Sequence, residues 1–529
     1  MTAKSKTARA LVGVALAVAS RVTAQAPPQI GSIAPLPAPA LAATFDVFEK
    51  SIVDLLAAQR IGTVTSKDLV EKYLARIRAY DQDGPRLNTM IALNPRALEE
   101  AAALDAERRA GRVRSPMHGI PIVVKDNYAT EGMPTTAGSQ ALAGFQTGRD
   151  GFMVKKLKDA GAVIIGKTNL HELAYGITSV SSAGGQTRNP YDPTRNPGGS
   201  SGGTGAAIAA SFAAAGMGTD TCGSIRNPAS ENSLFGLRGT AGLSSRDGIV
   251  PLAHSQDIGG PLARTVTDLL LMLDFTVGFD AADETTRGSQ GHIPRTYNGS
   301  VGDAGLGDVT IGVLTPLFGT ASEDQEVGRI VREALENLRA LGAGIVEVPF
   351  PGLDELLQNT SVINAEFKFD LLDFLSKYPA APVRSLGEIL LSGKYHQAVE
   401  PVLKRANEVT SRDSETYRAT LAKRAAARQA VLDAMSANGI TTFVYPTLRR
   451  KPAVIGQPQG GSNCQLSATT GLPAISMPAG FTSDGLPIGM DLLGGPWSEP
   501  TLLKVAYAYE RLATPRRSPK TTPPLGIVR

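Results

Sequence analysis

Cysteine is nearly absent from this 529-residue chain, which holds only Cys222 and Cys464. Two thiols form at most one disulfide, which excludes a disulfide-rich scaffold and a cysteine-based zinc cage. Histidine is scarce too: there are five, no HExxH motif occurs, and His118 and His171 are wrongly spaced for a metal site. We therefore expect neither a metal nor another cofactor.

The chain has no excess of positive charge beyond its first 26 residues. Its formal net charge of +4 matches four early basic residues, and the rest carries 49 basic and 49 acidic residues. A neutral body without a basic stripe gives no reason to expect nucleic acid as a partner. The hydrophobic content of 42% and charged content of 19% are those of an ordinary globular protein.

The N-terminal apolar run, residues 10–19, is too short to cross a bilayer core, which needs about 20 residues. It follows the early basic residues and precedes small-residue cleavage sites at residues 22–24 and 24–26. This layout is typical of a secretory signal peptide. We predict a signal peptide over residues 1–26, a proline-rich linker over 27–43, and an exported, periplasmic or secreted protein whose mature form has no membrane segment.

Strands and helices alternate along the remaining residues, 44–529. Apolar runs typical of buried strands occur at residues 119–126, 162–166 and 309–314. This alternation predicts an α/β fold, one large domain whose mixed, mostly parallel central sheet is covered by helices. A helical stretch, about residues 353–438, is expected to lie over part of its surface. The other predicted helices cover residues 65–77, 94–109, 152–160 and 324–341.

The most unusual segment is Asn-Pro-Gly-Gly-Ser-Ser-Gly-Gly-Thr-Gly at residues 196–205, followed by a predicted alanine-rich helix over residues 206–215. A flexible linker has a similar composition, but linkers do not usually run straight into an apolar helix. Glycines before a helix N-terminus let backbone N–H groups approach an anion or oxyanion closely. A Walker-type phosphate loop is disfavoured because no Gly-Lys-Ser/Thr triplet closes the segment.

A second small-residue turn, Gly-Thr-Asp-Thr-Cys-Gly-Ser-Ile-Arg at residues 218–226, surrounds Ser224. Ser224 could simply cap the next element. Two serine-centred glycine turns that flank one short helix instead favour a catalytic site.

Residues 198–202 also satisfy the G-x-S-x-G nucleophile elbow of α/β-hydrolases. That motif should follow a strand, whereas residues 191–197 contain two prolines. It also needs a histidine partner, and none of the downstream histidines, which are His254, His292 and His396, sits in a recognisable motif. This alternative is disfavoured.

From about residue 45 to its end, the chain resembles the amidase signature family, serine hydrolases with a Ser-cisSer-Lys triad. Two family spacings are present, since 75 residues separate Lys125 from Ser200 and 24 separate Ser200 from Ser224. The motifs that carry the resemblance lie at residues 119–126, 166–169, 198–203 and 220–226. Segments at residues 185–191, 245–249 and 497–500 look especially like bacterial peptide amidases.

The resemblance implies a role for each motif residue. Ser224 is the nucleophile, Ser200, expected after a non-proline cis peptide, relays its proton, and Lys125 is the base. Lys125 must be neutral to accept a proton, which requires burial and a lowered pKa. The oxyanion would be surrounded by the backbone N–H groups of Thr221, Cys222, Gly223 and Ser224. The implied reaction is hydrolysis of a carboxamide through an acyl-enzyme on Ser224, with release of ammonia or an amine.

The chain departs from the family at Cys222, where a glycine is common. Cys222 as the nucleophile is an alternative that the intact serine register disfavours. Asp220 and Arg226 are expected to form a structural ion pair. The segment after Asn463 resembles one that returns near the family's catalytic centre, so a bond between Cys222 and Cys464 is a further hypothesis.

Several other functions remain open. They are an aryl-acylamidase, carbamate or ester hydrolase of the same family, the A-type component of an amidotransferase, and a catalytically inactive binding protein. The substrate is expected to be a small-molecule or peptide amide. Its pocket is expected to come from residues 128–147, residues 175–182 and the helical stretch.

Overall fold

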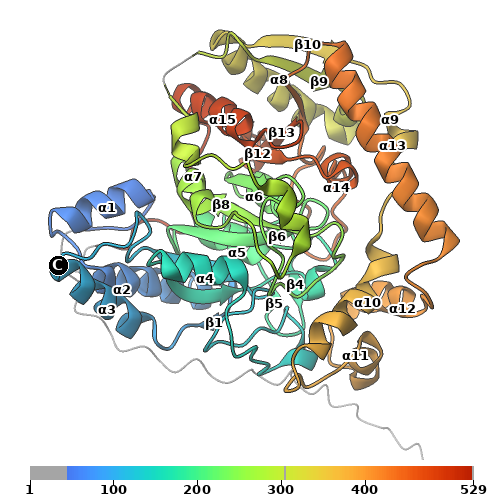
Figure 1. The fold of residues 1–529 in the computed structure, drawn as a ribbon. Helices are drawn as coiled ribbons and strands as arrows, with labels where there is room; N and C mark the ends of the chain where they lie inside the picture. Colours follow the sequence, from blue (N-terminus) through green and yellow to red (C-terminus); the bar gives the residue numbers. More distant parts are fainter. Residues whose placement is uncertain (1–44, 303–304, 527–529) are drawn as a thin grey trace, which may run out of the picture. The chain divides into compact units, whose positions relative to one another are not determined.

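A mixed sheet of eleven strands organises the residues that the computed structural model describes, 45–302 and 305–526 (Figure 1). The strand order is β1-β3-β2-β6-β8-β7-β12-β13-β11-β9-β10, and β4 and β5 form a separate two-stranded sheet. The strands of the large sheet are β1 Met90–Leu93, β2 Pro121–Lys125, β3 Val163–Thr168, β6 Ala215–Asp220, β7 Phe235–Arg238, β8 Ile258–Ala263, β9 Thr310–Leu314, β10 Gly344–Val348, β11 Thr442–Pro446, β12 Ala474–Phe481 and β13 Pro487–Gly494; the small sheet has β4 Val180–Ser181 and β5 Gly185–Gln186.

The predicted α/β class and mixed sheet are confirmed, but the sheet is less parallel than expected. Among the ten neighbouring pairs of the large sheet in the described residues, four are parallel and six antiparallel. The parallel pairs join β2 to β3 and β6, and β9 to β10 and β11. The middle of the sheet, from β6 to β11 through β8, β7, β12 and β13, is antiparallel.

Helices pack against this sheet and extend away from it at one side. They are α1 Ile52–Arg60, α2 Ser66–Ile77, α3 Ala97–Arg109, α4 Phe152–Asp159, α5 Gly202–Ala209, α6 Arg226–Glu231, α7 Val266–Asp274, α8 Gln325–Ala340, α9 Leu353–Leu357, α10 Ile363–Ser376, α11 Leu386–Ser392, α12 Glu400–Asn407, α13 Glu415–Ala437, α14 Gln465–Thr470 and α15 Glu499–Ala513. Among the helices of the described residues, none is long and apolar enough to span a membrane. The predicted signal peptide and linker, residues 1–43, lie outside the described residues.

Local sequence signals placed several helix starts. The Thr65 hydroxyl accepts from the Asp68 N–H and the Asp68 carboxylate accepts from the Thr65 N–H, which is a complete capping box before α2. The helix after the glycine turn is an exception, because it covers Gly202–Ala209 instead of residues 206–215. The chain leaves the helix there since residues 215–217 pair with β2 as the parallel strand β6.

The predicted helical stretch is α9 to α13, and α10 to α12 share one core with segments of the sheet domain. Tyr175 illustrates the contact: its ring lies edge-on to Phe367 of α10 with ring centroids 5.2 Å apart, and its hydroxyl donates to Asn364. In Figure 1 the long helix α13 runs beside α9 and α14 toward α10 and α12. The shared core consists of Ala137, Ala141, Leu142, Phe145, Leu173, Ala174, Val250 and Leu252 with apolar residues of α10 to α12 and of the segments between these helices.

Candidate active site

Lys125 ends the fully buried strand β2 and contacts two hydroxyl groups. Its Nζ donates to Ser200 Oγ at 2.7 Å and to Thr219 Oγ1 at 2.7 Å. Thr219 lies on the neighbouring parallel strand β6 and also accepts from Asn127 Nδ2 at 3.1 Å. Sequence reasoning missed Thr219, because only the pairing of β2 with β6 brings it to the lysine.

Burial makes Lys125 a suitable proton acceptor. Its side chain is fully buried, and the cost of burying an ammonium lowers its pKa to about 7, although the charges of Asp257 and Asp220 oppose the shift. Lys167 on the adjacent strand β3 is equally buried, but it lies 3.1 Å from the Asp126 carboxylate. Lys167 is thus paired with a carboxylate, whereas Lys125 faces hydroxyls.

Ser200 follows a cis peptide bond after Gly199, the non-proline cis bond expected at this position. Its neighbour Ser201 donates its N–H to the Ser224 carbonyl at 3.1 Å, which joins the two serine turns. Among the described residues no hydrogen bond links the Ser200 and Ser224 hydroxyls directly. Catalytic hydrogen bonds are often long in the absence of substrate, so this geometry is compatible with a relay.

The glycines around Ser200 serve close packing more than anion binding. The N–H groups of Gly202 and Gly203 donate to Ser179 Oγ at 3.0 Å and to the Asn169 carbonyl at 3.1 Å. A Cβ on Gly203 would lie 2.2 Å from the Asn169 carbonyl oxygen. The predicted approach of an anion to this helix N-terminus is therefore wrong, because the protein itself occupies these donors.

The loop around Ser224 has a different pattern of backbone hydrogen bonds. Within the described chain, the N–H groups of Thr221, Cys222 and Ser224 have no hydrogen-bond partner, although Thr221 and Ser224 are buried. Buried N–H groups without partners are rare, and they mark a place where a ligand atom can accept. The expectation for Gly223 is wrong, because its N–H donates to Asp220 Oδ1 at 2.7 Å and is not free to bind an oxyanion.

Asp220 stabilises the Ser224 loop through a hydrogen bond and ion pairs. Its carboxylate accepts from Gly223 and contacts the fully buried guanidinium of Arg226 at 3.1 Å, the ion pair that the sequence predicted. Arg238 lies 3.2 Å from Asp220, and Arg226 also contacts Asp491 at 2.7 Å. Burial disfavours the ionised form of Asp220, but the two guanidinium charges prevail and lower its pKa to about 2.

Cys222 and Cys464 form a disulfide with a Cα–Cα distance of 5.0 Å, which confirms the pairing hypothesis. The bond connects the Ser224 loop to the residue that precedes α14. A bonded cysteine is no thiolate, so the alternative of Cys222 as nucleophile is wrong for this state of the protein.

The α/β-hydrolase alternative finds no support in the geometry. No imidazole nitrogen among the described residues hydrogen-bonds to Ser200 or Ser224. His292 instead stacks on Trp497 with ring centroids 4.8 Å apart. His171 donates only its backbone N–H to the Ser200 carbonyl, and its ring accepts from the Thr178 N–H at 3.2 Å.

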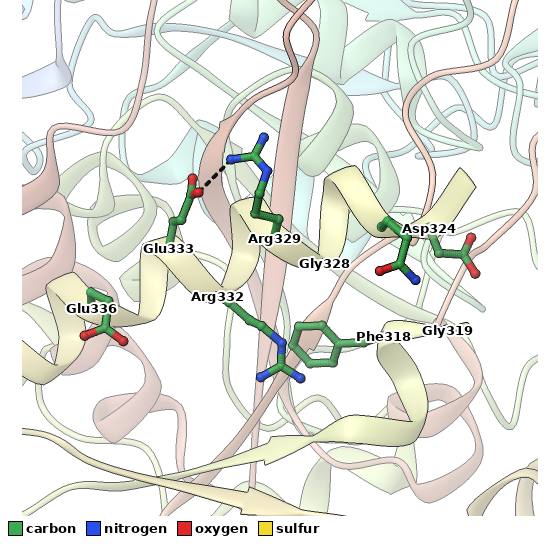
Figure 2. A pocket seen from close by; sticks show the side chains of 9 residues that line it. Phe318, Gly319, Asp324, Gly328, Arg329, Arg332, Glu333 and Glu336 are labelled. Carbon is green, nitrogen blue, oxygen red and sulfur yellow. Dashed lines mark hydrogen bonds and ion pairs between the residues drawn. The ribbon is translucent and has the colours of Figure 1, made fainter. Parts of the chain in front are cut away.

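A hollow of about 480 Å³ beside α8 is a second candidate site, shown in Figure 2. Its charged side chains have partners in and around the hollow: Arg329 contacts Glu333 at 2.6 Å, Arg332 contacts Glu347 at 2.6 Å, and Asp324 contacts Arg450 at 3.1 Å. The Arg332 guanidinium also lies 4.6 Å from the centre of the Phe318 ring. None of the triad residues lines it. These pairs are typical of a solvated helix face, so the catalytic candidate remains the Lys125 site.

Comparison with known proteins identifies the family to which the chain belongs. The chain matches the Amidase family over residues 68–503. It is 37% identical to the peptide amidase of Stenotrophomonas maltophilia, whose X-ray structure superposes with a TM-score of 0.84 over 90% of this chain and 99% of that one. It is also 34% identical to a probable amidase of Arabidopsis thaliana over 91% of this chain and 93% of the relative.

A third relative is the A-type component of the glutamyl-tRNA(Gln) amidotransferase of Halorhodospira halophila, which is 35% identical over 88% of this chain and 97% of its own length. The family match, the identities and the shared fold extend over nearly the whole described chain. The chain therefore belongs to the amidase family and is an enzyme that hydrolyses carbon–nitrogen amide bonds.

Proposed function

We propose that Ser224 is the nucleophile of this amidase, with Ser200 as proton relay and Lys125 as base. The observation that carries the proposal is the Lys125–Ser200 contact of 2.7 Å, made by a buried lysine whose pKa is lowered to about 7. A lysine with this pKa is partly neutral near neutral pH and can accept a proton, whereas an unperturbed lysine is almost fully protonated there.

The proposed reaction begins when neutral Lys125 accepts the proton of Ser200 as Ser200 accepts that of Ser224. The Ser224 oxygen then bonds to the amide carbon, and the carbonyl electron pair moves to its oxygen. The N–H groups of Thr221, Cys222 and Ser224, which have no partner among the described residues, would donate to that oxyanion, and one such donor is typically worth about 3 kcal/mol of barrier.

The same relay completes the reaction. Lys125 returns its proton through Ser200 to the leaving nitrogen, the C–N bond breaks, and ammonia or an amine departs. Water then attacks the Ser224 ester, with the relay again taking and returning a proton. Each proton that Lys125 accepts is given back, so the residue ends as it began.

We further propose a terminal carboxamide, or a small amide on a peptide-like or aryl acyl group, as the substrate. The likeness to a peptide amidase at 37% identity supports this choice. In the structure Tyr175, from one of the segments expected to line the acyl pocket, contacts α10 of the helical stretch. The amidotransferase alternative, supported by the Halorhodospira halophila relative, predicts instead that ammonia release needs a partner and aminoacyl-tRNA.

The decisive experiment incubates the purified chain alone with peptide amides, aryl amides and short esters and measures ammonia, amine and acid by mass spectrometry. We expect turnover of amides without any partner, and covalent labelling of Ser224 by a fluorophosphonate. Ser224→Ala should lose both, while Ser201→Ala keeps them, since Ser201 Oγ hydrogen-bonds to the Thr219 carbonyl. Labelling that survives in Ser224→Ala would show that another residue is the nucleophile.

Export of the protein is a separate proposal. Its supports are the signal-peptide layout of residues 1–26 and the disulfide, which is typical of oxidising compartments. Mass spectrometry of the protein from producing cells should find a mature chain that begins after residue 24 or 26. An intact N-terminus confined to the cytoplasmic fraction would contradict export.

A further inference from the structure

Two carbonyls beside the Ser224 loop are held from outside the loop. The Asp220 carbonyl accepts from Arg238 Nη1, and the Thr221 carbonyl accepts from Gln256 Nε2 at 2.7 Å. In a trans peptide the C=O and the N–H that follows it lie in one plane and point in opposite directions. The contact at the Thr221 carbonyl therefore sets the direction of the Cys222 N–H, which is turned away from Gln256.

Gln256 is itself fixed by a side chain from a distant helix. Arg424 of α13 donates from Nη1 to Gln256 Oε1 at 2.6 Å. A guanidinium can only donate and a backbone carbonyl can only accept, so the Gln256 amide satisfies both neighbours in one orientation. Arg424, Gln256 and the Thr221–Cys222 peptide thus form a single directional chain of hydrogen bonds.

Both neighbours of Gln256 in the chain, Ser255 and Asp257, also make hydrogen bonds to other segments. Glu366 of α10 accepts from the Ser255 N–H at 3.0 Å and from its hydroxyl at 2.5 Å. Asp257 accepts from the Thr221 hydroxyl and from the Leu252 N–H at 2.8 Å. Helices α10 and α13 therefore both hold the segment that contacts the Ser224 loop.

We propose that Gln256 and Arg424 are positioning residues for amide hydrolysis, which together turn the Thr221–Cys222 peptide so that its N–H faces the oxyanion. Through them helix α13, more than 150 positions along the chain from Gln256, controls the oxyanion site. This inference rests on the proposed role of Ser224, because an oxyanion forms only when a nucleophile adds to the amide carbon. Neither residue touches the reacting atoms; each acts through the peptide plane.

The test compares substitutions at Gln256 and Arg424 with a control on the same helix. Gln256→Glu keeps an acceptor for Arg424 but removes the N–H that binds the Thr221 carbonyl, and Arg424→Met removes the donor behind it. Arg424→Lys keeps one donor and should restore part of the activity. Arg428→Met is the control, because Arg424 and Arg428 both donate to carbonyls of α14, at Ala468 (2.9 Å) and Thr470 (2.6 Å), but Arg428 has no hydrogen bond to Gln256.

A merely structural role for these residues would not change kcat and the affinity of an inhibitor that forms a tetrahedral adduct by the same factor. We expect Gln256→Glu and Arg424→Met to lower kcat for an amide by about 10- to 100-fold, with KM changed by less than about threefold. The inhibition constant of a trifluoromethyl ketone, which forms a tetrahedral adduct with a serine, should rise by a similar factor. Arg428→Met should leave kcat and this constant nearly unchanged, with all variants compared at equal folded fraction by thermal unfolding.

Two outcomes would overturn the inference. One is a trifluoromethyl ketone affinity in Gln256→Glu equal to that of the wild type, and the other is an equal loss of kcat in Arg424→Met and Arg428→Met. Fluorophosphonate labelling of the wild type separates these results from a failure of the proposed function. If Ser224 is labelled but both substitutions leave the inhibitor affinity intact, only the positioning role is wrong; if Ser224 is not labelled, the nucleophile assignment is wrong.

Discussion

Lys125 Nζ lies 2.7 Å from Ser200 Oγ, and among the described residues its hydrogen-bond partners are hydroxyls and not carboxylates. A buried ammonium without a carboxylate partner is unstable, and for this reason the pKa of Lys125 falls to about 7. The buried Lys167, which contacts Asp126, shows the alternative arrangement in the same sheet. The lowered pKa of Lys125 suits the proposed proton transfer, whereas Lys167 forms a structural ion pair with Asp126.

The pH dependence of amide hydrolysis should report Lys125. Below its pKa the lysine is protonated and cannot accept a proton, so kcat/KM should rise with pH along a limb centred near pH 7. Lys125→Arg should be inactive throughout, because a guanidinium stays protonated. The measurement is kcat/KM from about pH 5 to about pH 9; a maximum at about pH 4 would be incompatible with a lysine base.

Lys125→Ala should damage amide hydrolysis more than hydrolysis of an activated aryl ester. An amine must be protonated before it leaves, whereas an activated phenolate needs little protonation, so only the amide reaction loses both the base and the acid. We expect the amide rate to fall by at least about 10-fold more than the ester rate. Both rates are measured in wild type and variant, and an equal fall of the two would refute proton donation by Lys125.

Removal of the disulfide should lower both stability and activity. The bond closes a loop of 242 positions and joins the Ser224 loop to the residue that precedes α14, so Cys222→Ser with Cys464→Ser should cost about 2–4 kcal/mol of unfolding free energy. Turnover should fall as well, because the bond holds residue 222 in place and the N–H of that residue is one of the unpartnered donors. Thermal unfolding and kcat of the double variant and of dithiothreitol-treated wild type are the measurements. Unchanged values in both samples would contradict this prediction.

Asp220→Asn should destabilise the fold strongly. The buried guanidinium of Arg238 would lose its carboxylate partner and that of Arg226 one of two, and breaking such a pair typically costs about 3–5 kcal/mol. Asp247→Asn is the control, since its pair with the more exposed Arg149 should be worth about 1 kcal/mol or less. Thermal unfolding of both variants should show a much larger decrease for Asp220→Asn.

The same carboxylate gives stability a defined pH dependence. The folded-state pKa of Asp220 is about 2, below the usual value near 3.8, so its contribution is complete above about pH 4. It is lost as the pH falls from about 4 toward 2. In Asp220→Asn this part of the acid dependence should be absent, which unfolding curves between these pH values would detect.

The amino-acid sequence alone determined what depends on neighbouring residues. The capping box at Thr65 and Asp68, the buried strand that ends at Lys125 and the serine turns at Ser200 and Ser224 are local patterns. Each is decided by propensity, hydrogen bonding or apolar content within about ten positions. The α/β class followed from their alternation, since strands and helices of this order form only a few architectures.

Tertiary structure decided the features that join distant segments. The pairing of β2 with β6 brings Thr219 to Lys125, and the packing of α13 brings Arg424 to Gln256, 168 positions away. The family motif predicted that the Gly223 N–H binds the oxyanion, but in the folded chain this N–H donates to Asp220. Such contacts leave no periodic signal in the sequence, because their partners are chosen by the packing of the whole sheet and by the burial of polar groups that must find a partner.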